Sequence, residues 1–243
     1  MTDRIKEALN SNMKWKFIGL ILRFILFVVA ATLYFTKSSI MEYPVSFFEK
    51  LLPLHFLWLA FMILFVSRLF GKKGALIARN RVYAKYNNIV LDYNREKLKN
   101  FIKKANLRII WIIALALIFN IPWWICYHRG IIDEGFLVVM FLFLFFLDMI
   151  CETLWCPFQR IFMKNRCCHV CRIFAWDSLL AISPLIIIPS FFSWTLVAVA
   201  AIEAIHFEIK FYKHPEYFWD GSNAALRCSN CTTKMCVVRG KRA

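Results

Sequence analysis

Long apolar runs, separated by polar and mostly basic segments, dominate the pattern along the chain. Runs of about 17–22 mostly apolar residues are long enough to cross a hydrocarbon core of about 30 Å at 1.5 Å per residue. Four runs are continuous, and a fifth stretch is long enough for two shorter spans that turn near Pro189. These segments are residues 15–34, 51–70, 109–127, 136–155 and 173–211. The pattern therefore predicts an all-α, polytopic integral membrane bundle of about six transmembrane helices.

The composition also favours a bilayer and argues against nucleic acid as a partner. The chain has 243 residues, of which 60% are hydrophobic and 25 are Phe, which is too apolar for an ordinary soluble domain. The formal net charge of +16 could suggest a nucleic-acid binder. Such a protein would place its basic residues on a soluble fold with base-stacking aromatic residues. Here the basic residues lie between the apolar runs.

The distribution of Lys and Arg predicts the orientation, because positive loops are retained on the cytoplasmic side of a membrane. The loop 72–108 contains eleven of these residues, and the N-terminal segment, the connection 156–172 and the C-terminal tail are basic as well. The opposite side carries Lys37, Lys50 and Arg129. We therefore expect both termini to be cytoplasmic, in a bacterial cytoplasmic membrane. Residues 173–211 must then form a hairpin of two spans or a re-entrant pair.

This topology divides the chain into four parts. Residues 1–155 form a four-span bundle with the basic loop 72–108, and residues 156–172 form a cysteine-rich connection. The membrane hairpin 173–211 follows, and then the cysteine-rich tail 212–243. Within the basic loop, the apolar positions of 81–104 suit an amphipathic helix on anionic headgroups, or a solvated connector helix. Anionic lipid is thus an expected partner.

Eight of the nine cysteines lie on the predicted cytoplasmic face, and Cys126 lies on the other side. Cys168-His-Val-Cys171 and Cys228-Ser-Asn-Cys231 form two C-x2-C knuckles, a spacing that lets two thiolates approach one metal ion. The hairpin between them returns the chain to the face that it left, so we expect these four cysteines to share one metal. We also expect the tail to depend on this metal, because it has few other apolar segments.

The ligand types suit two different metals. Four thiolates accept zinc or an iron–sulfur centre equally well. Eight cysteines on one face are enough for two sites, and Cys156-Pro157 repeats a dipeptide that follows cluster ligands in bacterial ferredoxins, although the rest of that motif is absent. The wide separation of the knuckles is also found in zinc ribbons. We therefore expect an iron–sulfur cluster, with zinc as the alternative and with Cys156 and Cys236 as further ligands.

Charged residues inside the hydrocarbon are costly and usually face a partner or a cavity. Arg23, Asp148 and Glu203 lie at similar depths, about 10 Å from the cytoplasmic ends of their predicted spans at helical rise. Glu152 follows Asp148 by one turn. We expect Arg23 to lie within ion-pair reach of Asp148 or Glu203. Such a network would fix the register of the helices, or it would line a path for protons or a substrate.

The leading functional hypothesis is an integral membrane metalloprotein that relays electrons. Its iron–sulfur centres would pass electrons between a cytoplasmic donor and a membrane carrier or partner subunit, as a redox subunit of a membrane oxidoreductase complex. The sequence contains no P-loop, nucleophile elbow, zincin or dinucleotide-binding motif, so no catalytic residue is assigned. The alternative hypothesis is a transporter-like or scaffold protein in which zinc attaches the tail to the connection 156–172.

Overall fold

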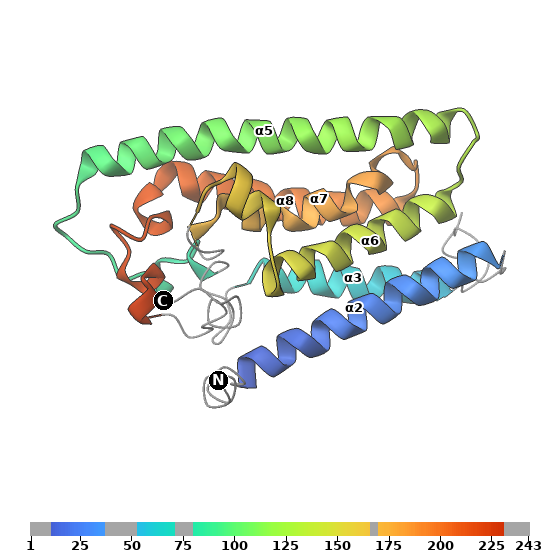
Figure 1. The fold of residues 1–243 in the computed structure, drawn as a ribbon, viewed down its shortest axis with the longest axis horizontal. Coiled ribbons are helices and arrows are strands. Elements are labelled where there is room, and N and C mark those ends of the chain that lie inside the picture. Colours follow the sequence, from blue (N-terminus) through green and yellow to red (C-terminus); the bar gives the residue numbers. More distant parts are fainter. Residues whose placement is uncertain (1–10, 37–52, 71–79, 166–169, 231–243) are drawn as a thin grey trace.

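The computed structural model describes residues 11–36, 53–70, 80–165 and 170–230, and it contains no β-strand within these ranges. The six main helical segments run alternately in opposite directions (Figure 1). The elements are α2 (Ser11–Phe35), α3 (Pro53–Arg68), η2 (Ala84–Tyr86), α5 (Arg95–His128), α6 (Glu134–Thr153), η3 (Phe158–Phe162), η5 (Arg172–Ala175), α7 (Asp177–Ile182), η6 (Ser183–Ile187), α8 (Phe191–Lys213), η7 (Pro215–Phe218), η8 (Ala224–Leu226) and η9 (Cys228–Asn230).

Four of these helices are long and apolar enough to cross a membrane. They are α2, α5, α6 and α8. Large apolar side chains such as Leu22, Ile118 and Ile205 remain exposed on their outer faces, which suits a lipid environment. The all-α fold class is therefore confirmed for the described residues. The spans predicted at 51–70 and in the first half of 173–211 stay predictions, because their helices are shorter.

The hairpin predicted at 173–211 is asymmetric. Its first arm consists of six residues of α7 and five of η6, which together extend about 19 Å at 1.5 and 2.0 Å per residue. Pro184 lies at the start of η6, where its missing N–H interrupts an α-helical ladder. Ser190 then caps α8, accepting a hydrogen bond from the backbone of Phe192. The first arm is therefore shorter than a full span, whereas α8 is long enough for one, and the choice between two spans and a re-entrant pair stays a prediction.

The predicted amphipathic helix over 81–104 is wrong for its first half. Helix α5 begins only at Arg95, and it continues without interruption into the predicted third span. Asn94 starts it by accepting a hydrogen bond from the backbone N–H of Lys97. Before this cap, Asn87 donates hydrogen bonds to two backbone carbonyls, those of Arg81 and Tyr83. Such side-chain bonds hold the backbone in turns instead of a helix.

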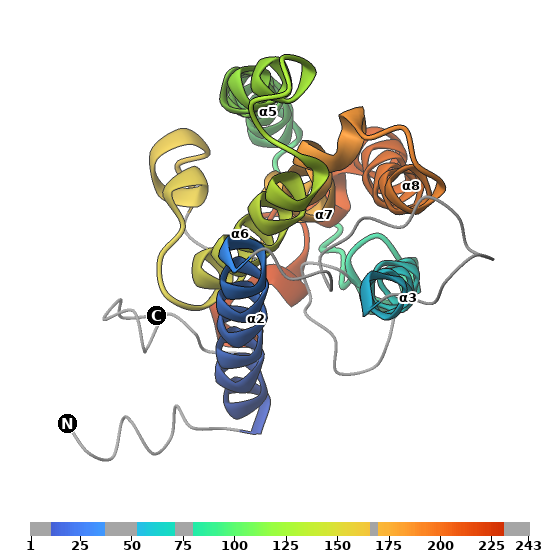
Figure 2. The ribbon, with the colours of Figure 1, turned by 90° about the vertical axis from the view of Figure 1, so that its right-hand side faces the viewer.

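The main core lies between α2, α3, α6, α7, η6 and α8. Its centre contains fully buried residues from four of these elements, Phe65, Leu137, Ile182 and Ala200. Helix α2 packs along α6, and a Cβ atom at Gly19 would lie 3.3 Å from Cε of Met149, so the small residue lets the helices approach closely. Helix α5 lies at the margin of the bundle (Figure 2).

A second, smaller unit caps one end of the bundle. Val82 and Ala105 pack there against Phe207 and Phe211 of α8 and against Phe218 of η7. Residues 214–230 therefore fold back onto α8 and onto the segment before α5, next to the start of α5 in Figure 1.

One buried amide fixes this cap. Asn223 is fully buried, and its Nδ2 donates to Oδ1 of Asn87 at 2.8 Å and to the carbonyl of Tyr217 at 2.9 Å. Its Oδ1 accepts from the backbone N–H groups of Asn88 and Ala225. The expectation that the tail has little besides metal to hold it is therefore wrong up to Leu226, because long-range polar contacts and buried Phe218 hold it.

Candidate functional site

Two ion pairs join α2 to α6. Nη1 of Arg23 lies 2.8 Å from Oδ2 of Asp148, and Nζ of Lys16 lies 2.7 Å from Oε1 of Glu152. Arg23 also donates to the carbonyl of Phe145 at 2.8 Å, and its guanidinium lies 3.7 Å from the centre of that ring. The predicted ion pair between Arg23 and Asp148 is thus present, and its role stays a prediction.

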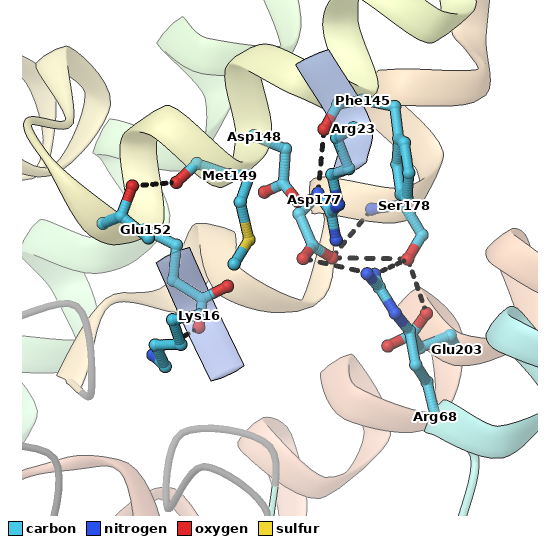
Figure 3. A network of polar contacts seen from close by, with 11 residues as sticks. Lys16, Arg23, Arg68, Phe145, Asp148, Met149, Glu152, Asp177, Ser178 and Glu203 are labelled. Atoms are coloured by element: carbon cyan, nitrogen blue, oxygen red, sulfur yellow. Dashed lines mark hydrogen bonds and ion pairs between the residues drawn. The ribbon is translucent and has the colours of Figure 1, made fainter. Parts of the chain in front are cut away.

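A second cluster, which we call the Arg68 cluster, joins α3, α7 and α8. Nη1 of Arg68 donates to Oγ of Ser178 at 2.5 Å and lies 3.3 Å from Oδ2 of Asp177. The hydroxyl of Ser178 donates in turn to Oε2 of Glu203 at 2.8 Å. Figure 3 shows this cluster beside the pair formed by Arg23 and Asp148.

Glu203 therefore differs from the expectation. It belongs to the Arg68 cluster, whereas Arg23 contacts Asp148 and Phe145. The two groups lie beside each other in the bundle (Figure 3). The bundle thus contains two neighbouring groups of paired charges.

Sequence reasoning missed Arg68, Asp177 and Ser178. Arg68 stands two residues before the end of the apolar run 51–70, where a basic residue reads as an interfacial anchor. Asp177 lies near the start of 173–211. Both were visible as charges within apolar stretches, but their pairing depends on the short first arm of the hairpin, which brings Asp177 to the depth of Arg68.

A cavity of about 390 Å³ lies between α5, α6 and the segment 156–183. We call it the α5–α6 cavity. Its apolar lining includes four phenylalanines, Phe119, Phe143, Phe158 and Phe174. Its polar lining consists of Asn120, Asp148, Cys151, Glu152, Cys156, Gln159, Cys171, Asp177 and Ser183. The cavity therefore combines a mostly apolar wall with the carboxylates of both charge clusters.

Packing contacts flank the stretch of α5 that lines this cavity. At one end, Trp123 of α5 packs against Phe136 of α6, with ring centroids 5.5 Å apart. At the other end, Ile109 and Ile112 of α5 pack against Met163, Cys171 and Ile173. The volume of the cavity falls within the range of about 300–1,000 Å³ that is typical of small-molecule sites.

Polar side chains from three segments hold the backbone around Cys171. Nη2 of Arg81 donates to its carbonyl at 2.6 Å, and the Arg81 guanidinium lies 4.9 Å from the ring of Phe207. The next residue, Arg172, forms an ion pair with Glu208 of α8 and donates to Asn106 of α5. These contacts fix the second cysteine of the first knuckle between α5 and α8.

The predicted ligands are only partly within the described ranges. Cys156 and Cys171 are buried and both line the α5–α6 cavity, whereas Cys228 is exposed in η9. Among the described residues, no group of three or more His, Cys, Asp or Glu is arranged to hold a metal ion. Cys168, Cys231 and Cys236 lie outside the described residues, so the shared site at Cys168, Cys171, Cys228 and Cys231 stays a prediction.

No protein-family model, curated protein or solved structure matches this chain. The chemistry must therefore be argued from the residues. Paired carboxylates can take up or release protons, thiols can ligate metal, and the apolar wall can bind a molecule that partitions into the membrane.

Proposed function

We propose that this protein is a multi-pass membrane metalloprotein that relays electrons from a cytoplasmic donor to a membrane carrier or a partner subunit. One or two iron–sulfur centres would carry the electrons. Their proposed ligands are Cys156, Cys168, Cys171, Cys228, Cys231 and Cys236. The observation that carries the proposal is that Cys156 and Cys171 both line the α5–α6 cavity. A centre on these cysteines would lie beside a space suited to an apolar carrier.

The proposed topology has six passes and places both ends of the chain in the cytoplasm of a bacterial cell, where thiols stay reduced. The alternating directions of the helices support it. So does the distribution of charge, because the basic start of α5 and the basic end of α8 lie at the end of the bundle where the cysteine-rich segments begin. At that end, lysines such as Lys97 and Lys104 would contact anionic headgroups.

Metal analysis of protein purified without oxygen tests the function. We expect iron together with acid-labile sulfide, and broad absorbance in the visible range. Cys171→Ser and Cys228→Ser should each lose most of the iron, because each removes one ligand thiolate from a four-thiolate site. Cys126→Ser is the matched control and should retain it, since Cys126 lies near the opposite end of α5.

The same samples separate the two candidate functions. Zinc that depends on Cys171 and Cys228, in protein without iron, would support the scaffold or transporter-like protein with a structural zinc site. Metal content that is unchanged in both Ser variants would contradict the shared site and the electron relay together.

A further inference from the structure

The α5–α6 cavity contains a polar group that the ion pairs do not use. Asn120 of α5 is 3% exposed and lines the cavity. Its Nδ2 donates to Oγ of Ser183 at 2.9 Å and to the carbonyl of Ala116 at 2.7 Å. Within the part of the chain that the structure describes, its Oδ1 accepts no hydrogen bond. A buried acceptor without a donor is unfavourable, so a ligand with a donor group would stabilise it.

The size of the cavity restricts that ligand. A volume of 390 Å³ corresponds to about 13 water molecules at about 30 Å³ each. A ring system with a few substituents fits this space, whereas a two-chain phospholipid does not. The four phenylalanines of the lining favour a planar ring, because aromatic rings stack in offset or edge-to-face geometry.

The position of Asn120 relates this ring to the cysteines. Asn120 follows Ile112 by eight residues on α5, which is about 12 Å at helical rise. Ile112 packs against Cys171 of the first knuckle. A ring beside Asn120 would therefore lie two turns away from the proposed metal ligands.

We propose that the α5–α6 cavity binds the ring of an isoprenoid quinone, with a hydroxyl group of the reduced form donating a hydrogen bond to Oδ1 of Asn120. This inference rests on the proposed electron relay and names its membrane carrier. The isoprenoid tail would leave the cavity toward the lipid. The oxidised form has carbonyl oxygens in place of the hydroxyls, so it cannot make this bond and binds through the ring and tail alone.

Equilibrium binding of a decyl-chain benzoquinone to the full chain in phosphatidylcholine nanodiscs tests the proposal, with the probe in its oxidised or its reduced form. Asn120→Leu keeps an apolar side chain of similar size and removes the acceptor. We expect it to weaken binding of the reduced probe about tenfold or more and to change binding of the oxidised probe much less. Equal effects on both forms would overturn the assigned hydrogen bond.

A second pair of variants tests the cavity itself. Ala116→Phe places a ring in the cavity and should abolish binding of both probe forms. Ala114→Phe adds the same ring to the same helix at a residue that does not line the cavity, and it should bind both forms normally. Unchanged binding in Ala116→Phe would overturn the site. Displacement by dodecanol as readily as by the reduced probe would show a simple acyl-chain cleft and overturn the quinone assignment.

Metal analysis of the same nanodiscs distinguishes this inference from the proposed function. Iron in the protein without probe binding would refute the quinone site alone. Probe binding that depends on Ala116 and Asn120, in protein without iron, would refute the electron relay alone.

Discussion

Two buried arginines show how single residues join distant parts of this chain. Arg68 binds Asp177 and Ser178 within the bundle. Arg81 is fully buried in the cap, with its guanidinium 4.9 and 5.0 Å from the ring centres of Phe207 and Phe218. Guanidinium groups suit such sites because they stack on rings and are weakly hydrated. Each arginine therefore holds a helix of the second half against a segment of the first half.

At the residue scale, the pair of Arg23 and Asp148 gives a test of stability. Arg23→Leu leaves the largely buried carboxylate of Asp148 without its cation, and we expect a loss of about 3 kcal/mol in unfolding free energy. The double variant Arg23→Leu with Asp148→Leu should lose less, because no charge is stranded. Thermal unfolding in detergent, followed by the loss of helicity, measures both.

Lys16→Leu is the matched control for this test, because Lys16 pairs with Glu152 on the same two helices but within the first two turns of α2. Its effect should be smaller than that of Arg23→Leu. A double variant less stable than the single Arg23→Leu would contradict an ion pair whose main cost is the stranded charge.

The sequence predicted the pairing of Arg23 and did not predict the pairing of Arg68. Both outcomes have one physical cause. Counting residues along two full helices gives depth at 1.5 Å per residue, and α2 and α6 are such helices. Arg68 binds the first turn of α7, whose depth depends on where the hairpin begins and how far it extends. A local pattern does not contain that information.

At the scale of elements, long apolar runs were predictable and the cap was not. Hydrophobic runs select helices because every backbone group must be satisfied inside lipid, and α2, α6 and α8 follow from this rule. The segment around Asn87 and the tail around Asn223 meet through bonds between residues 136 apart. Each partner alone reads as an ordinary polar loop, so the sequence pattern did not predict their contact.

This cap yields a prediction about the tail. Asn223→Ala removes two donated and two accepted hydrogen bonds, and we expect the local stability of the cap to fall by about 2 kcal/mol. Hydrogen exchange of the amides of Val90 and Ala224, which bond across this contact, should become about 30-fold faster at 1.4 kcal/mol per tenfold change.

Asn230→Ala is the control for the cap, because Asn230 is exposed and its side chain donates to a single carbonyl, that of Ala224. Exchange should change little in this variant. Removal of metal from the wild-type protein should also leave these two amides protected, since the contacts of Asn223 involve no cysteine. Rapid exchange after chelation alone would show that metal, and not Asn223, holds this part of the tail.

At the scale of the whole molecule, the distribution of charge and the packing of the cap both distinguish one end of the bundle. Basic residues lie near the ends of α2, α5 and α8 that face the cap, among them Lys16, Arg95 and Lys213. At the other end of α5, Arg129 is followed closely by Asp133 and Glu134. The main core lies between these two ends. The bundle therefore has an axis with a basic end beside the cap and an opposite end where Arg129 is balanced by acidic residues.

This axis predicts the topology of the protein in its membrane. A reporter that is active only in the cytoplasm should be active when fused after residue 243 or inserted at residue 91, and inactive when inserted after Gly130. The reason is that short loops rich in Lys and Arg are retained in the cytoplasm, while the helices that flank Gly130 run to the opposite end of the bundle. The insertion at residue 91 is the matched control for the insertion at 130, because both fall in segments that flank α5. Activity at 130 together with inactivity at the C-terminus would invert the topology, and it would also remove the reducing compartment on which thiolate ligation of iron by Cys171 and Cys228 depends.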